Sequence, residues 1–252
     1  MIDFHSHILP NVDDGPDSLS ESLTMLHRSF RQGVDLIVAT SHFYASEEYP
    51  RDFLNRRNQA FLRLQNAMLM EPEAYPEIIP GAEVLYFPGI SDAEGIGSLT
   101  IGTSKCILIE PPMAPWSELM LDEIAQLGRN LRCMPVIAHV DRFMLMLRDD
   151  TLMKRVRQRD MMVQVNAEYF LNPKTVKAAI RNLKKGYIQL IGSDCHNLYS
   201  RAPNLGLARK QAKAFGVEAE FEKLHQNAAE LLFRGGCVNA NIKVSHLAAK
   251  RS

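Results

Sequence analysis

Two histidines lie two positions apart at the start of the chain, His5 and His7, in a segment that begins by alternating apolar and polar residues. Residues two apart on an extended chain point to the same face, so both imidazoles are expected to leave one side of a short strand. Two imidazoles that converge at a strand end are suited to binding a metal ion. A single His-x-His sequence is common by chance, however, and it also fits a polar strand end exposed to solvent.

Further candidate metal ligands occur where later apolar segments end. They are Asp14, His42, Glu83, Glu110, His139, Asp194 and His196. Most follow the carboxyl end of an expected strand directly, whereas Asp14 lies in the first strand-to-helix loop and Glu83 slightly inside its strand. In a β/α barrel these positions meet at one mouth. A pocket with five imidazoles and four carboxylates requires cations that balance and organise them.

The donor atoms indicate which metals to expect. Nitrogen and oxygen donors without a thiolate favour manganese, iron or zinc over calcium or magnesium. Three divalent ions, offset by the four carboxylates and one bridging hydroxide, would leave a small positive charge suited to binding phosphate. The remaining histidines, His27, His225 and His246, fall in expected helices and are assigned to solvent or packing.

The elements that must position these residues alternate between short apolar strands and amphipathic helices. The expected strands are residues 2–5, 36–42, 78–84, 106–110, 135–139, 162–166 and 188–196. The expected helices are residues 17–33, 51–70, 117–130, 151–159, 173–186, 203–215 and 218–233, with a tail helix after Asn239. The glycine- and serine-rich segment 86–104 is expected to form a hairpin or an excursion from the fold.

Fully apolar strands separated by helices are typical of a parallel sheet covered on both faces. The even alternation predicts an α/β fold in a single domain over residues 1–252, a distorted seven-stranded β/α barrel with C-terminal helices. An open doubly wound sheet is the alternative.

Composition excludes several other classes of protein. The 252 residues include 29 basic and 29 acidic side chains, which gives no reason to expect a nucleic acid or a membrane surface as partner. No apolar segment approaches the length of a membrane span, so no membrane insertion is expected. The four cysteines lack paired zinc-type spacing, and with no export signal in the sequence they point to the reducing cytoplasm. Assembly into an oligomer is left open.

One cysteine suggests a different chemistry. Cys195 and Arg201 have the C-x5-R spacing of cysteine-dependent tyrosine phosphatases, in which a thiolate attacks phosphorus. The segment between them contains no glycine, and Asp194 places a negative charge next to the thiol that raises its pKa. We therefore predict that Cys195 takes no part in the reaction.

The sequence resembles the PHP (polymerase and histidinol phosphatase) superfamily, and within it the manganese-dependent tyrosine phosphatases of bacterial capsule and exopolysaccharide operons. The resemblance runs in order from residue 1 to about residue 206. It rests on the segments MIDFHSHILPNVDDGP, SLSESLTMLHRSFRQGV, IVATSHF, GAEVLY, ILIE, PVIAHVDRF, VQVNA and IGSDCHNLYSRAPNLG.

The resemblance implies three divalent metal ions, most often Mn2+, with Fe or Zn possible. One ion would be held by His5, His7, Glu83 and Asp194. Glu83 would bridge to a second ion held also by Glu110 and His139, and a third would be held by Asp14, His42 and His196. Arg142 and Arg201 match the phosphate-binding arginines, and Asp3 and Asn166 are expected to orient ligands.

The resemblance also implies the reaction, attack of a metal-bridging hydroxide on the phosphorus of phosphotyrosine. The expected substrate is the tyrosine-rich tail of the kinase that controls polysaccharide export. Two other functions remain open. One is a phosphatase of a small phosphate monoester such as histidinol phosphate, which a panel of metabolites would separate. The other is a barrel that keeps metals for structure alone, for which missing ligands would be the sign.

Overall fold

The computed structural model of the protein describes residues 1–147 and 149–233. Within these residues nine strands form two sheets, and all the neighbouring pairs are parallel. The smaller sheet has the order β1-β2-β4, formed by Ile2–Ser6, Leu36–Ala39 and Glu77–Pro80. The larger has the order β3-β5-β6-β7-β8-β9, formed by His42–Phe43, Glu83–Leu85, Cys106–Glu110, Met134–Ile137, Met162–Asn166 and Leu190–Gly192.

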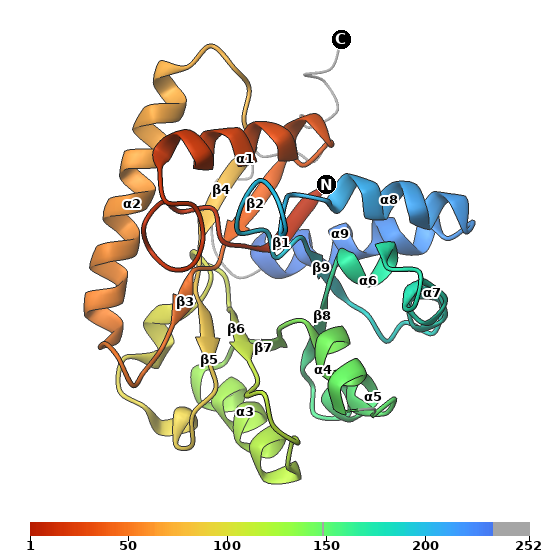
Figure 1. The fold of residues 1–252 in the computed structure, drawn as a ribbon. Helices are drawn as coiled ribbons and strands as arrows, with labels where there is room; N and C mark the ends of the chain where they lie inside the picture. The colour runs from red at the N-terminus through yellow and green to blue at the C-terminus, as the bar shows by residue number, and fades with distance from the viewer. Residues whose placement is uncertain (148, 234–252) are drawn as a thin grey trace.

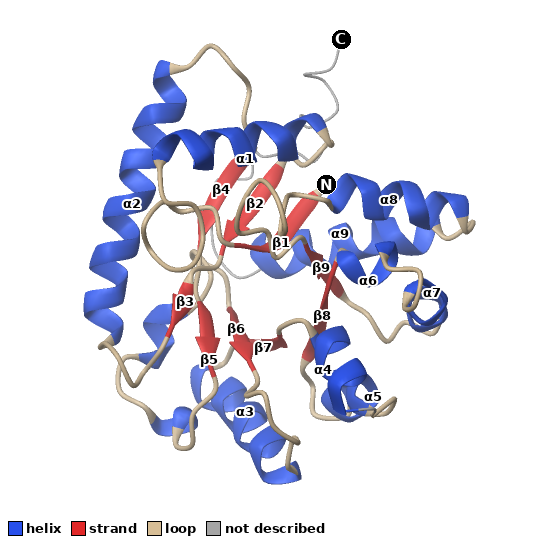
Figure 2. Ribbon diagram, viewed as in Figure 1, coloured by secondary structure: helices blue, strands red, loops and turns tan. Residues whose placement is uncertain are grey.

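Helices lie around the outside of the strands (Figure 1 and Figure 2). They are α1 (Leu19–Arg31), α2 (Pro50–Met70), α3 (Glu118–Leu131), α4 (Val140–Leu147), α5 (Leu152–Arg157), α6 (Glu168–Leu171), α7 (Val176–Lys184), α8 (Leu205–Ala214) and α9 (Glu218–Phe233). The sequence explains the start of α1, because the Ser18 side chain accepts a hydrogen bond from the backbone N–H of Glu21, as expected of an N-cap serine. Because the strands pair in parallel and helices surround them, the protein has an α/β fold, as predicted.

The predicted count of seven strands is wrong, because two of the predicted strands are each divided in two. Residues 36–42 form β2 and β3, and residues 78–84 lie across β4 and β5. At the first interruption the Thr40 hydroxyl accepts a hydrogen bond from the Ser6 N–H, so a side chain replaces a regular ladder contact. At the second, Gly81 packs so closely that an added Cβ would lie 3.0 Å from Ile101.

Backbone hydrogen bonds join β1 to the segment that follows β9. The Asp194 N–H donates to the His5 carbonyl at 2.8 Å, and the His7 N–H donates to the Cys195 carbonyl at 2.9 Å. The close approach requires Gly192, since a Cβ there would lie 2.4 Å from the Cβ of His5. The first and last ligand-bearing segments of the sequence are thus neighbours in space.

Helix α9 packs at the end of the fold where the strands begin. Its Ala228 and Leu232 belong to a buried apolar cluster with Ile2, Leu36 and Cys106, the first residues of β1, β2 and β6. The predicted ligands lie at the opposite, carboxyl ends of the strands. No helix among the described residues is long and apolar enough to cross a membrane.

Other expectations differ from the structure in detail. Of the hairpin or excursion expected over segment 86–104, the hairpin is absent, and the segment contains two short 3-10 helices, η1 (Ile90–Asp92) and η2 (Ile96–Leu99). Helix α4, which begins directly after His139, and the short α6 were not expected, whereas the helix predicted over 173–186 is present as the shorter α7. The tail helix predicted after Asn239 lies outside the described residues.

Candidate metal and phosphate site

The nine predicted ligands come together at the carboxyl ends of the strands. Four overlapping groups of them place one nitrogen or oxygen per residue within 4.8 Å of one another. The groups are His7, Asp14, His42 and His196; His5, His7 and Glu83; His5, His139 and Asp194; and His42, Glu83 and Glu110. The positions predicted from the sequence therefore form one continuous cluster of donor atoms.

Glu83 lies at the centre of the cluster. Its Oε2 is 3.1 Å from His5 Nε2, 3.2 Å from His7 Nε2 and 3.2 Å from His42 Nδ1. Burial raises the pKa of Glu83, but attraction to His5 and His139 outweighs it, and the pKa lies well below its usual value. Both carboxylate oxygens are buried without a hydrogen-bond partner among the described residues, so both are free to bind cations.

The spacing of the donor atoms fits shared metal ions. Two ligands that bind one ion at about 2.0–2.2 Å lie roughly 3.0–3.5 Å apart, and the contacts of Glu83 fall in this range. Three ring nitrogens of the cluster are also buried with no hydrogen-bond partner among the described residues. They are His42 Nδ1, His139 Nδ1 and His196 Nε2. Unpartnered buried nitrogen and carboxylate atoms aimed at one another are what a set of cation ligands requires.

Asp14 forms the more exposed end of the cluster. Its Oδ1 lies 3.1 Å from His196 Nε2 and 3.6 Å from His42 Nε2. Burial, with the neighbouring His7 as the second cause, lowers the pKa of His196 to about 2 and also lowers the pKa of His42. A lowered pKa favours the neutral ring, the state in which an imidazole binds a metal.

Two residues that were not predicted from the sequence contact the rings of His5 and His7. Asp13 Oδ2 accepts a hydrogen bond from His7 Nδ1 at 2.7 Å, and Gln164 Oε1 lies 3.2 Å from His5 Nδ1. Each contact turns the Nε2 atom of the histidine toward the cluster. Gln164 could have been noticed as a polar residue inside the apolar strand 162–166, and Asp13 as the neighbour of Asp14.

Asp3 and Asn166 lie beside the ligands, as expected. Asp3 Oδ1 accepts a hydrogen bond from the Ser193 N–H at 2.8 Å, and burial raises the Asp3 pKa to about 6. Asn166 Nδ2 donates to Asp194 Oδ2 at 2.7 Å. Asn166 is thus in direct contact with a predicted ligand, whereas Asp3 acts on the backbone next to Asp194.

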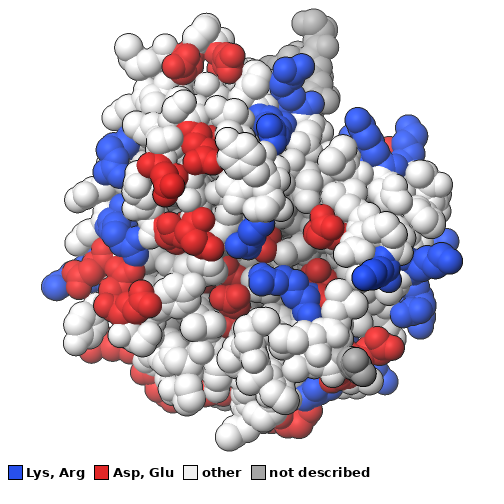
Figure 3. All heavy atoms as spheres, viewed as in Figure 1, with Lys and Arg blue, Asp and Glu red and all other residues white. Residues whose placement is uncertain are grey.

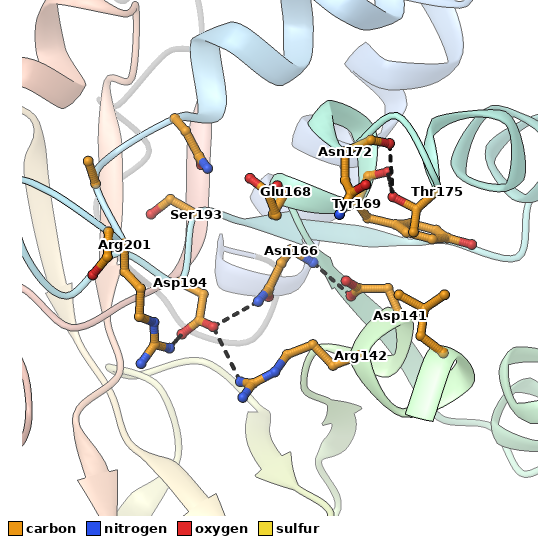
Figure 4. A pocket seen from close by; sticks show the side chains of 14 residues that line it. Asp141, Arg142, Asn166, Glu168, Tyr169, Asn172, Thr175, Ser193, Asp194 and Arg201 are labelled. Carbon is orange, nitrogen blue, oxygen red and sulfur yellow. Dashed lines mark hydrogen bonds and ion pairs between the residues drawn. The ribbon is translucent and has the colours of Figure 1, made fainter. Parts of the chain in front are cut away.

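Both predicted phosphate-binding arginines reach the cluster from its open side (Figure 4). Arg201 Nη2 donates to Asp194 Oδ1 at 2.8 Å, and Arg142 Nη1 lies 3.6 Å from Asp194 Oδ2. Their side chains are 36% and 44% exposed, so a ligand entering from solvent meets them. Figure 3 shows basic and acidic side chains together near the centre of this face. Guanidinium groups beside a cation site suit a phosphate ester.

The thiol of Cys195 faces the packed interior. The residue is fully buried, and burial is the main reason that its pKa is raised above the usual value. A reactive cysteine needs an accessible thiolate. The structure therefore gives no support to a cysteine nucleophile at the C-x5-R sequence.

A parallel α/β fold with histidines and carboxylates at the carboxyl ends of its strands is typical of metal-dependent hydrolases. The chain belongs to the capsular polysaccharide synthesis CpsB/CapC family, whose sequence model matches residues 1–233. It is 30% identical over 251 residues to a tyrosine-protein phosphatase CpsB of Streptococcus agalactiae, covering 92% of this chain and 98% of the relative. It is 28% identical over 242 residues to the tyrosine-protein phosphatase YwqE of Bacillus subtilis, covering 93% and 92%.

The fold is also that of a solved relative. The match is to a crystal structure from work on YwqE of Bacillus subtilis and CpsB of Streptococcus pneumoniae, which are described there as metal-dependent tyrosine phosphatases. The TM-score is 0.78 at 24% sequence identity, over 94% of this chain and 96% of the other. This likeness establishes the shared fold.

Proposed function

We propose that the protein is a metal-dependent protein-tyrosine phosphatase, a hydrolase of phosphoric monoesters. The observation that carries this proposal is the position of Arg142 and Arg201 beside the nine-residue donor cluster, because together they suit a phosphate ester. Membership of the CpsB/CapC family and the names of the relatives support it.

The proposed cofactors are three divalent metal ions, with Mn2+ as the metal and Fe or Zn as alternatives. The proposed sets are His5, His7, Glu83 and Asp194; Glu83, Glu110 and His139; and Asp14, His42 and His196. Two of the groups of donor atoms support the first and third sets, and the second is supported by His139 Nε2, which lies 3.1 Å from Glu110 Oε1 and 3.5 Å from Glu83 Oε1. When bound, the ions would supply Lewis-acid stabilisation of phosphoryl oxygens and an activated water.

The protein's own residues have three roles in this proposal. Arg142 and Arg201 bind the phosphate and stabilise the charge that develops on its oxygens. Asp13 and Gln164 fix the orientation of His7 and His5. Phenolate is a fairly good leaving group, so hydrolysis of phosphotyrosine needs less help from a general acid than hydrolysis of an alkyl phosphate does.

The finer proposals concern the substrate and the architecture. We propose as substrate the tyrosine-rich tail of the cytoplasmic kinase that regulates capsule or exopolysaccharide synthesis, in line with the name of the family. We also propose that residues 1–252 form one domain and that the strands form a distorted barrel. The hydrogen bonds between β1 and the segment after β9 support the barrel.

Metal dependence tests the function. The protein is stripped with a chelator, reloaded with Mn2+, Mg2+, Zn2+ or Fe2+, and assayed with p-nitrophenyl phosphate and a phosphotyrosyl peptide, while bound metal is measured by mass spectrometry. Activity is expected to be lost on chelation and restored by Mn2+ better than by Mg2+. Full activity in excess chelator, with no metal in the protein, would refute the proposal.

A further inference from the structure

The charges of the chain are divided unevenly between its two parts. Residues 1–150 carry 22 acidic and 11 basic side chains, whereas residues 151–252 carry 7 acidic and 18 basic. Figure 3 shows the result on one face of the molecule, where most acidic side chains lie on the left and Lys and Arg side chains line the right edge. The balanced total charge therefore conceals an acidic side and a basic side, and the basic side can attract a partner that the total charge would not.

Helix α7 supplies the centre of the basic side. Lys177, Arg181 and Lys184 are spaced four and three residues apart, so they lie on one face of the helix, and Lys185 follows directly. All four side chains are exposed, and none forms an ion pair with a carboxylate in the part of the chain that the structure describes. The opposite face of the helix is buried, so these unpaired charges are what solvent or a partner meets.

Helix α8 ends on the same side of the molecule as α7 (Figure 1), and both helices pack against α6. Its second half exposes Lys210 and Lys213, of which Lys213 approaches the carboxylate of Glu218 at 3.8 Å. Phe215, directly after the helix, is 41% exposed. The end of α8 therefore presents an aromatic side chain to solvent among basic ones.

We name this surface the basic face and define it by Lys177, Arg181, Lys184, Lys185, Lys210, Lys213 and Phe215. We infer that the basic face binds an anionic lipid surface, with its charges attracted to the headgroups and Phe215 entering the boundary below them. The binding is peripheral and goes beyond the proposed function, because no residue of the basic face is a predicted metal ligand or a phosphate-binding arginine.

The composition of the basic face favours lipid over other polyanions. Five of its six charges are lysines, which are compact point charges on flexible stems, whereas a phosphate or a base held in fixed geometry suits the planar fork of arginine. A lipid surface presents negative charge everywhere and requires no fixed geometry. It also repels the acidic side of the protein, so the charge division turns the basic face toward the lipid.

Flotation with lipid vesicles tests the inference without any turnover. The protein is mixed at low salt with vesicles of phosphatidylcholine alone, or of phosphatidylcholine and phosphatidylglycerol in equal parts. We expect binding to the anionic vesicles only, and release when salt is added, because salt screens the attraction. The triple variant Lys177→Gln, Lys184→Gln, Lys185→Gln should bind roughly a hundredfold more weakly, at about fivefold per charge. Phe215→Ser should weaken binding roughly fivefold through lost apolar burial.

A matched variant separates the local surface from the net charge. Arg51→Gln, Arg63→Gln and Lys105→Gln together remove the same charge from exposed positions in the acidic part of the chain. This variant should keep most of the wild-type binding. Both triple variants should hydrolyse p-nitrophenyl phosphate at the wild-type rate, which also shows that they are folded. A wild type that floats with anionic vesicles but hydrolyses no phosphate ester would refute the proposed function and leave the lipid surface standing.

Several results would overturn the inference. One is a wild type that stays unbound in the presence of anionic vesicles at low salt, and another is an equal loss of binding in the two triple variants. Self-association at low salt without vesicles, abolished by the changes on α7, would assign the basic face to the acidic side of a second copy of the chain. Tighter binding of duplex DNA than of vesicles, with the same loss, would assign it to nucleic acid.

Discussion

The Oδ2 atom of Asp13 accepts hydrogen bonds from both the His7 ring, at 2.7 Å, and the His42 backbone, at 2.9 Å. Its other oxygen accepts a hydrogen bond from the Gly15 N–H at 3.0 Å. One carboxylate therefore ties the end of β1 to β3 and to the loop that carries Asp14. Burial raises the Asp13 pKa, but His7 outweighs it and lowers the pKa below its usual value.

Replacing Asp13 by Asn is expected to weaken metal binding by about 10- to 100-fold, the usual effect of losing a group that orients a ligand. All three groups that Asp13 contacts are donors, so the amide of Asn places an N–H against at least one of them. Metal affinity is measured by competition with a fluorescent chelator. Asp17→Asn, an exposed change on the same loop, is the control, and equal affinities in the two variants would show that Asp13 is not needed.

The variants Arg142→Ala and Arg201→Ala are each expected to lose about 2–4 kcal/mol of transition-state stabilisation, the scale of one preorganised charge contact. The metal content should remain that of the wild type, because neither arginine is a metal ligand in the proposed site. Kinetics with p-nitrophenyl phosphate and metal analysis of the same samples provide the measurement. Unaltered kcat/KM in both variants would exclude the arginines from the phosphate site.

Cys195 and His196 give opposite expectations. The Cys195 thiol is fully buried and away from the reaction, so Cys195→Ser should retain most of the activity and the metals. His196 lies 3.1 Å from Asp14, and His196→Ala should lose both activity and metal. A trapped phosphocysteine, or an inactive Cys195→Ser protein with full metal content, would favour the cysteine mechanism.

His225 is expected to make stability depend on pH. Its Nδ1 contacts the backbone of Ile2, and burial, with the charge of the N-terminus as a second cause, lowers its pKa to about 3. Below pH 6.5 the unfolded chain binds a proton at His225 that the folded protein excludes, so the free energy of unfolding falls as the pH falls.

Urea unfolding of the wild type and of His225→Asn, at pH 7 and pH 5, measures this effect. The wild type is expected to lose roughly 1–2 kcal/mol more than the variant over this range, following about 1.4 kcal/mol per pKa unit. The metal cluster titrates equally in both proteins, so its contribution to the free energy of unfolding cancels when the two pH profiles are compared. Parallel pH profiles would mean that His225 does not control this dependence.

The parallel α/β fold could be predicted from the sequence alone, and so could the set of residues that lie together at the strand ends. Short apolar strands have a strong pattern, and the polar residue after each strand marks the carboxyl edge of the sheet. The division of strand 36–42 depends on the hydrogen bond of Thr40 to Ser6, a tertiary contact that no local pattern contains. Helix α4 was missed because its residues follow His139 without a visible N-cap, and Asp13 because its hydrogen bonds with the His7 ring and the His42 backbone exist only in the folded chain.

The hydrogen bond from the Asp194 N–H to the His5 carbonyl has a consequence for the order in which the parts of the site are made. His5 is synthesised well before Asp194, its hydrogen-bonding neighbour on one side, because most of the other ligands lie between them in the sequence. Until then one edge of β1 has no partner, and contacts between such distant residues form late in folding. A nascent chain that stops before Gly192 lacks Asp194 and His196, so the cluster of nine donor residues can assemble only after this last strand has been made.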